Sequence, residues 1–413
     1  MSGRAAGRLL VAGLLLLAPG ARAEPKSYEL LYDVRLLPTE RSAEVSLRVR
    51  QAQHAFRSLL LLRDAERQIG FAGDGTLQEE GSGLRWTPPP EGGTLAWSVR
   101  LDHLRDAQSY DARITDSWAV FRGDDLFPPV RARTLVGAVS RARLRLRLPS
   151  QWSAAVPYAR NDDGSYTVER PGRGFDRPVG WMVAARRLGV VRERVAGVSV
   201  GVAGPVGHHV RRLDLLALLR WTLPRLRPVL PLPDRLLVVT VGDPMWRGGL
   251  SGPGSLYVHA SRPLLTPDGT SPLLHELFHT VLARPGAPGD DWIAEGLAEV
   301  YALEMLVRSG TISRARHERI LVKLAERGRE ATSLRVPASA GAVTARAVIL
   351  LYELDERIRK ESQGASSLDE VVRALAASPE PLSTSRLREA AERAAGEDLS
   401  GWFDRPELAA PGP

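Results

Sequence analysis

Residues 271–286 combine two properties that few folds accommodate together: an apolar helical pattern and three ionisable side chains inside it. A Ser-Pro pair at 271–272 is typical of a helix start and a Pro-Gly pair at 285–286 of a stop. The apolar positions between them are Leu273, Leu274, Leu277, Phe278, Val281 and Leu282. Burying two histidines and a glutamate in such a helix is costly unless a partner satisfies them. The fold must therefore bring a partner to this segment.

The spacing of the three polar residues indicates that this partner is a metal ion. His275 and His279 stand at i and i+4, so both imidazoles project from one helix face and can close on one Zn²⁺. Glu276 lies between them, beside the position that a three-ligand zinc site leaves open. The pattern is typical of a metallopeptidase and predicts one zinc ion per chain.

A second predicted helix supplies two more carboxylates. After a turn over residues 285–289, Asp290 or Asp291 can cap a helix whose apolar positions are Trp292, Ile293, Leu297, Val300 and Leu303. Glu295 can face back toward the first helix, and Glu299 lies one turn further along the same face. There it can accept the free N–H of a ligating histidine. The alternative is a solvated helix face, which the small residues around Glu295 disfavour.

Two segments carry a resemblance to a known family. His-Glu-Leu-Phe-His-Thr at 275–280 and Trp-Ile-Ala-Glu-Gly-Leu-Ala-Glu-Val-Tyr at 292–301 resemble the gluzincin metallopeptidases, especially the bacterial glycyl aminopeptidase family and the relatives of aminopeptidase N. The resemblance implies that His275, His279 and Glu295 bind zinc and that Glu276 is the general base of peptide-bond hydrolysis. Residues 303–313, 357–375 and 396–405 are similar to the later helices of that family.

The chain departs from the family at two positions. Gly248-Gly249-Leu250 is followed by Ser251, where the resemblance implies a glutamate that holds the substrate's free amino group. Val343 stands where family members commonly place a tyrosine that stabilises the oxyanion. Losing an oxyanion donor typically costs on the order of 10²- to 10³-fold in rate. A weak or inactive zinc-bearing scaffold is therefore the alternative interpretation.

Other side chains are candidates for the roles that these departures leave open. Tyr352 or His317 can replace the missing oxyanion donor. Residues 255–260 form a predicted edge strand beside the cleft, along which an extended peptide can add main-chain hydrogen bonds. The substrate-binding candidates are Gly248, Gly249, Ser251 and Tyr257. His259, on the same strand, points either into the cleft or to solvent.

The N-terminus predicts export. Two arginines precede an apolar run at 9–18, and Ala21-Arg22-Ala23 follows, which fits a cleaved signal peptide over residues 1–23. The apolar run is short for a bilayer span, and no later segment is typical of one. The chain has no cysteine, so folding needs no disulfide. We expect a secreted or periplasmic bacterial protein without stable membrane insertion after cleavage.

Composition argues against nucleic acid as a partner. The formal net charge is +8, and because the first 23 residues contribute three arginines and no acid, the mature chain carries 8 − 3 = +5. Arginines at 141–147 alternate with apolar residues as in a half-buried strand, and no nucleic-acid-binding motif accompanies them. The predicted partner is a peptide or protein substrate, with an anionic envelope surface as a weaker one.

The pattern of segments predicts a multidomain α+β protein. Residues 24–194 show short alternating runs separated by Gly, Pro and Asp, which is typical of a β-sandwich. Residues 195–408 are expected to form a thermolysin-like, mostly helical zinc-peptidase domain with C-terminal helices, and 409–413 a tail. Residues 118–127 are expected to pack between the domains rather than form a substrate rim, and His208-His209 to lie in a loop. A binding protein of the cell envelope is a further alternative.

Overall fold

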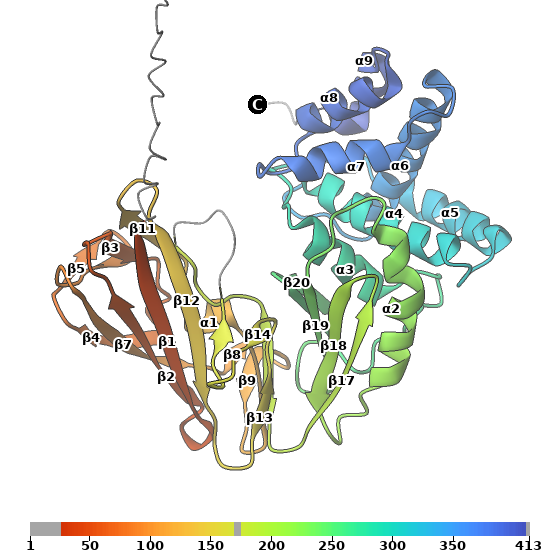
Figure 1. Ribbon diagram of the computed structural model, residues 1–413. Helices are drawn as coiled ribbons and strands as arrows, with labels where there is room; N and C mark the ends of the chain where they lie inside the picture. Colours follow the sequence, from red (N-terminus) through yellow and green to blue (C-terminus); the bar gives the residue numbers. More distant parts are fainter. Residues whose placement is uncertain (1–25, 169–174, 410–413) are drawn as a thin grey trace, which may run out of the picture.

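The computed structural model describes residues 26–168 and 175–409, and within them it is an α+β protein with four β-sheets (Figure 1). The expected signal peptide at 1–23 lies outside the described residues, as does all but the first residue of the expected tail. In Figure 1 the N-terminal strands occupy the left of the molecule and helices α3–α9 the right. None of the helices in the described ranges is long and apolar enough to cross a membrane.

The N-terminal unit contains a seven-stranded and a four-stranded sheet. The first has the order β14-β15-β12-β1-β2-β7-β4 and the second β11-β3-β6-β5. The bounds in the first are β1 (Ser27–Leu37), β2 (Ser42–Arg50), β4 (Gln68–Gly73), β7 (Gly92–Arg100), β12 (Val139–Arg147), β14 (Ala159–Arg160) and β15 (Tyr166–Thr167). Those in the second are β3 (Phe56–Leu61), β5 (Thr76–Glu80), β6 (Gly83–Thr87) and β11 (Val130–Thr134).

These two sheets share one apolar core. Alternate residues of β1, β2 and β12 are buried, so each strand presents one face to the core and one to solvent. Tyr32 and Leu47 from the seven-stranded sheet join Phe56 and Trp86 from the four-stranded one. The alternation expected for residues 141–147 is confirmed, because Ala142 and Leu144 are buried and the arginines between them are exposed.

A third sheet of order β13-β16-β10-β9-β8 connects the two halves of the molecule. Its strands are β8 (His103–Leu104), β9 (Tyr110–Ile114), β10 (Trp118–Arg122), β13 (Ser153–Ala155) and β16 (Trp181–Ala185). Phe121 and Met182 face the N-terminal core, whereas Trp118 and Trp181 face a core shared with the fourth sheet. The expected packing role of residues 118–127 agrees with this burial.

The fourth sheet has the order β17-β18-β19-β21-β20. Its strands are β17 (Leu188–Val195), β18 (Val198–Pro205), β19 (Arg235–Val239), β20 (Gly249–Gly252) and β21 (Ser255–Val258). Strand β17 pairs along its whole length with β18. The boundary expected between residues 194 and 195 therefore falls too late, because β17 belongs with the C-terminal sheet.

Both faces of this sheet are covered, by different partners. Val238 and Leu256 pack against helices α2 (Arg212–Leu226) and α3 (Pro272–Leu282). Val239 and Tyr257, one residue further along each strand, pack against the third sheet. The Trp181 backbone N–H also donates to the Ser255 hydroxyl at 2.7 Å. The N-terminal unit therefore supports the sheet from which the cleft is built.

The C-terminal half is mostly helical, as expected, and its helices share the core beneath the fourth sheet. Besides α1 (Gly123–Leu126), α2 and α3, the helices are α4 (Asp291–Arg308), α5 (Arg314–Gly328), α6 (Ala342–Glu361), α7 (Leu368–Ala377), α8 (Thr384–Ala395) and α9 (Ser400–Phe403), with 3₁₀ turns at Pro38–Glu40 and Pro406–Leu408. Gly296 lets α4 and α6 approach closely, since a Cβ there would lie 2.9 Å from the Ala347 side chain.

Candidate metal centre

Helix α3 forms where the sequence predicts it. Ser271 is the N-cap in an extended conformation and Pro272 is the first helical residue. The helix ends at Leu282, because Ala283 adopts a left-handed conformation and its N–H donates to the His279 carbonyl. Its apolar side chains enter the core, so the helix is held rigidly under the sheet.

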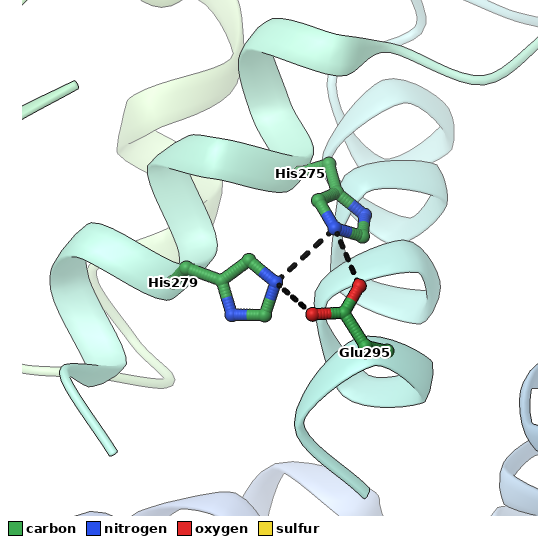
Figure 2. Close-up of side chains that lie close together, drawn as sticks. All are labelled: His275, His279 and Glu295. Carbon is green, nitrogen blue, oxygen red and sulfur yellow. Dashed lines mark hydrogen bonds and ion pairs between the residues drawn. The ribbon is translucent and has the colours of Figure 1, made fainter. Parts of the chain in front are cut away.

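Helix α4 brings the third polar group to the same place. Figure 2 shows the His275, His279 and Glu295 side chains directed toward one point between the two helices. His275 Nε2 and His279 Nε2 lie 3.1 Å apart, and each lies 3.2 Å from an oxygen of Glu295. Within the described residues this is the only group of three or more His, Cys, Asp and Glu side chains arranged to hold a metal ion.

Glu299 fixes the orientation of one histidine. Its Oε2 lies 2.9 Å from His275 Nδ1, so His275 donates this N–H to Glu299 and its Nε2 is directed at Glu295 and His279. Burial lowers the pKa of His275, but hydrogen bonds to Glu295 and Glu299 outweigh it and raise the pKa to about 10. Glu295 and Glu299 are 28% and 13% exposed, so the alternative of a solvated helix face is wrong.

The donor set fits a zinc ion. Ligands about 2.0–2.1 Å from a tetrahedral zinc stand roughly 3.3 Å from one another. The separations of 3.1–3.2 Å in this cluster are close to that value. Two imidazole nitrogens and a carboxylate oxygen are also the ligand types of catalytic zinc sites with one open position. A cation at the common point would replace the proton through which His275 Nε2 bonds to Glu295.

Glu276 lies beside this cluster, under strand β20. A Cβ on Gly249 would lie 2.7 Å from Glu276 Cγ, so the strand packs directly on the glutamate. Burial raises the pKa of the Glu276 carboxyl, and this outweighs the nearby histidines and a hydrogen bond from the Ser251 backbone, which lower it. A carboxylate with a raised pKa is better suited to accept and return a proton near neutral pH.

Strand β20 forms the free edge of the fourth sheet. Residues 255–260 were predicted to form that edge, and this prediction is wrong. Residues 255–258 form β21, which lies between β19 and β20, so a substrate strand would add to β20 instead. Because side chains alternate along a strand, Gly249 and Ser251 face Glu276 whereas Leu250 packs on the opposite side. Ser251 therefore carries the one side chain that β20 presents to the metal cluster.

Two predicted substrate-binding residues are buried. Tyr257 faces the third sheet, is 1% exposed and donates its hydroxyl to the Trp246 carbonyl, so its expected contact with substrate is wrong. Gly248 is also buried, and a Cβ there would overlap the Trp246 ring. These two residues shape the cleft from behind it.

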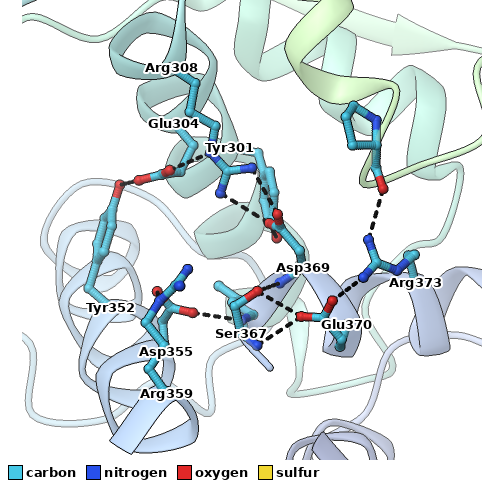
Figure 3. Close-up of polar contacts among 12 residues, drawn as sticks. Tyr301, Glu304, Arg308, Tyr352, Asp355, Arg359, Ser367, Asp369, Glu370 and Arg373 are labelled. Atoms are coloured by element: carbon cyan, nitrogen blue, oxygen red, sulfur yellow. Dashed lines mark hydrogen bonds and ion pairs between the residues drawn. The ribbon is translucent and has the colours of Figure 1, made fainter. Parts of the chain in front are cut away.

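The side chains proposed to replace the missing oxyanion donor are engaged elsewhere. The Tyr352 hydroxyl donates to Glu304 at 2.9 Å and lies 2.9 Å from His317 Nε2 (Figure 3 shows the bond to Glu304). Glu304 lies nine residues beyond Glu295 on α4, which is roughly 13 Å along a helix axis. Val343, in the first turn of α6, packs against the apolar core.

The remaining histidines lie apart from the metal cluster. The sequence left two orientations open for His259, into the cleft or to solvent. The structure shows neither, because His259 is buried beside Ser261 and Asp243. His208 and His209 lie in a loop, as expected, and the His208 ring contacts Trp118 edge-on. Sequence reasoning missed the His317–Tyr352 contact, since its residues are 35 positions apart.

Comparisons with known proteins agree on the fold. An aminopeptidase N family protein from Idiomarina loihiensis is 14% identical with a TM-score of 0.61, covering 92% of this chain and 74% of its own. An M1 zinc metallopeptidase from Deinococcus radiodurans is 16% identical with a TM-score of 0.57, covering 93% and 94%. Legionella pneumophila aminopeptidase A, in complex with aspartic acid, is 13% identical with a TM-score of 0.52, covering 91% and 48%.

No family model matches the sequence, and no curated protein does. The likeness to these proteins is therefore one of fold, seen in the structures.

Proposed function

We propose that this chain, which has the fold of the M1 zinc metallopeptidases, is a zinc-dependent peptidase. The convergence of His275, His279 and Glu295 on one point, with Glu276 beside it, supports this proposal most directly. A protein that only bound peptides would have no need of a general base next to a zinc site. We further infer the finer architecture expected from the sequence, an N-terminal β-sandwich followed by a thermolysin-like domain, and export to the periplasm or medium.

The chain's own residues would divide the reaction as follows. Zinc, when bound by His275, His279 and Glu295, supplies a Lewis acid that polarises the scissile carbonyl and makes water a better nucleophile. Glu276 accepts the proton of the attacking water and returns it to the leaving amine. Glu299 holds the His275 ring so that its Nε2 stays directed at the metal.

The edge strand defines how a substrate would lie. An extended peptide can pair with β20 and place its scissile bond above Glu276. The side chain facing the site from this strand is the uncharged Ser251 hydroxyl, in the position that an amine-binding glutamate holds in the family it resembles. We infer that the substrate's N-terminal amine is not strongly required, so internal bonds can be cut.

The Glu276→Gln variant tests the function. The amide keeps the size of the side chain and leaves the three ligands intact, but it cannot accept a proton. We expect zinc content equal to wild type and a loss of at least about 10²-fold in peptide hydrolysis. Elemental analysis and a peptide-library cleavage assay measure the two. Equal inactivity of wild type and variant would favour the alternative, a zinc-bearing scaffold without activity. Ser251 and Val343 suggest that alternative, because they replace two residues expected in an active enzyme of the family.

A peptide and its N-acetylated twin test the inferred substrate. We expect similar kcat/KM for both, because no charged group is offered to the amine at position 251. A loss above roughly 100-fold on acetylation, about 2.7 kcal/mol of transition-state binding, would instead show an aminopeptidase whose amine is held by another carboxylate.

A further inference from the structure

The outer face of the seven-stranded sheet is rich in arginine. Five arginines on two strands point away from the core: Arg48 and Arg50 on β2 and Arg141, Arg143 and Arg145 on β12, with β1 between the two strands. We call this set the arginine face. The pairing places Arg50 and Arg141 on either side of Glu29, and Arg48 and Arg143 on either side of Leu31. The guanidinium groups are thus held over one small area.

Most of this positive charge is not neutralised. Arg143 is paired with Asp163 at 3.8 Å. The other four arginines form no ion pair with any residue in the described part of the chain. Neighbouring arginines differ in this respect, since Arg147 is paired with Asp33 and Arg35 with Glu44. Guanidinium groups that are unpaired and also line one groove favour an anion as their partner.

The face is also hollowed. A groove of about 300 Å³ is lined by all five arginines together with Glu29, Leu30, Leu31, Asp163 and Ser165. Counting these charges leaves three positive ones in excess. Guanidinium groups match the geometry of phosphate oxygens and bind them bidentately.

Exposed valines lie at the same end of the sheet. Val136 is fully exposed in the turn before β12, and Val139, the first residue of β12, is 46% exposed. The Val139 N–H donates to the Lys26 carbonyl, so Val139 lies where the chain enters β1, two residues before Arg141, and Val136 lies three residues before Val139. Apolar side chains gain by entering a lipid interface, whereas a nucleic acid backbone offers them little.

We propose that the arginine face binds the surface of an acidic phospholipid bilayer, with the guanidinium groups on lipid phosphates and Val136 and Val139 at the interface. The excess positive charge and the groove favour phosphate groups as the ligand. The exposed valines favour a lipid bilayer over other polyanions. Nothing in this face belongs to the metal cluster, so the interaction is independent of the proposed peptidase activity. It would hold the folded enzyme at an envelope surface by electrostatics rather than by a membrane span.

Vesicle cosedimentation tests the proposal. The purified chain is mixed with vesicles of phosphatidylcholine alone or with phosphatidylglycerol added, at low and high NaCl. We expect binding to the acidic vesicles only, weakening as salt is raised. Replacing Arg48, Arg50, Arg141 and Arg145 by Gln should weaken that binding roughly 100-fold, since each basic side chain near an acidic surface contributes measurably. Circular dichroism confirms that the variant is folded.

A matched control separates the local face from net charge. Arg225, Arg316, Arg319 and Arg329 are exposed, form no ion pair with a described residue and lie on or next to α2 and α5. Replacing these four by Gln removes the same charge and should leave vesicle binding near wild type. Val136→Asp should weaken binding by a few-fold, about 3- to 10-fold.

Several results would overturn the proposal. These are equal binding to neutral and acidic vesicles, unchanged binding by the face variant, or an equal loss in the control variant. Salt-sensitive binding of duplex DNA that the face variant loses, while its vesicle binding persists, would show that the face recognises nucleic acid instead.

Discussion

Helix α4 carries two polar clusters, one toward each end, that differ in composition and in what they can hold. In the first, Glu295 and Glu299 face His275 and His279, and Figure 2 shows the two histidines with Glu295. About two and a half turns after Glu295, Glu304 and its neighbours form a second cluster between α4, α6 and α7 (Figure 3). In both, carboxylates on one helix meet donors from others, but only the first brings three metal-ligating atoms to one point.

The second cluster pairs each charge with its opposite. Arg308 bonds to Glu304 at 2.7 Å and to Asp369 at 2.9 Å, and the Tyr301 hydroxyl donates to Asp369 at 2.7 Å. Burial raises the pKa of Asp369, but these bonds from Arg308 and Tyr301 outweigh it and lower the pKa. In the first cluster, two imidazole nitrogens and a carboxylate oxygen converge on one point instead. The difference separates a cluster that joins helices from one that can hold a cation.

The largest expected effect is on the first cluster. His279→Ala removes one of three zinc ligands, so we expect the zinc content to fall close to zero and hydrolysis by at least about 10³-fold. His317→Ala on α5, whose ring contacts Tyr352 in the second cluster, is the control and should keep both. Elemental analysis with the peptide assay measures the pair. Full zinc in the His279 variant would mean that this residue is not a ligand.

Breaking the second cluster should change stability without changing metal content. Asp369→Ala removes the acceptor of the Tyr301 hydroxyl and one of the two carboxylates bonded to Arg308, so we expect unfolding in urea to need about 2–3 kcal/mol less free energy. Zinc per chain should stay at wild type. Glu389→Ala, an exposed position on α8, serves as the control. Loss of zinc together with stability would show that the two ends are coupled.

The smallest expected effect concerns Tyr352. Tyr352→Phe removes one hydroxyl from the second cluster, which should cost about 1 kcal/mol of stability because Glu304 and His317 lose a partner. The hydrolysis rate should not change. A rate loss on the order of 10²-fold at full zinc content would instead identify Tyr352 as the oxyanion donor and contradict its placement in the second cluster.

The metal cluster was predictable because its geometry is local. His275 and His279 share one helix, and the turn after it returns the chain so that Glu295 faces them. The order of strands in the sheets was harder to predict from the sequence, since it depends on contacts between distant segments. Residues 188–195 follow the N-terminal strands directly in the sequence, and nothing local says that β17 joins another sheet. The same limit hid the insertion of β21 between β19 and β20, and so the burial of Tyr257.

Partners in the second cluster were hidden for the same reason. Glu304 and Arg308 stand at i and i+4, which predicts their contact. Asp369 lies 61 positions after Arg308, and no pattern in the sequence connects them. Its helix α7 begins with a capping box at Ser367, which fixes where the helix starts but not what it meets.

The glycine-rich edge strand limits how this protein can diverge. Gly249 admits no larger residue without displacing Glu276, and the side chain of Leu250 points away from the site. Ser251 is therefore the one position on β20 where a substitution can change the side chain that faces the metal cluster. A lineage acquiring a new substrate preference here would do so by one substitution rather than by gradual accumulation. If a substrate lies along β20 as proposed, saturation mutagenesis of position 251 would sample the side chains that this strand can present to it.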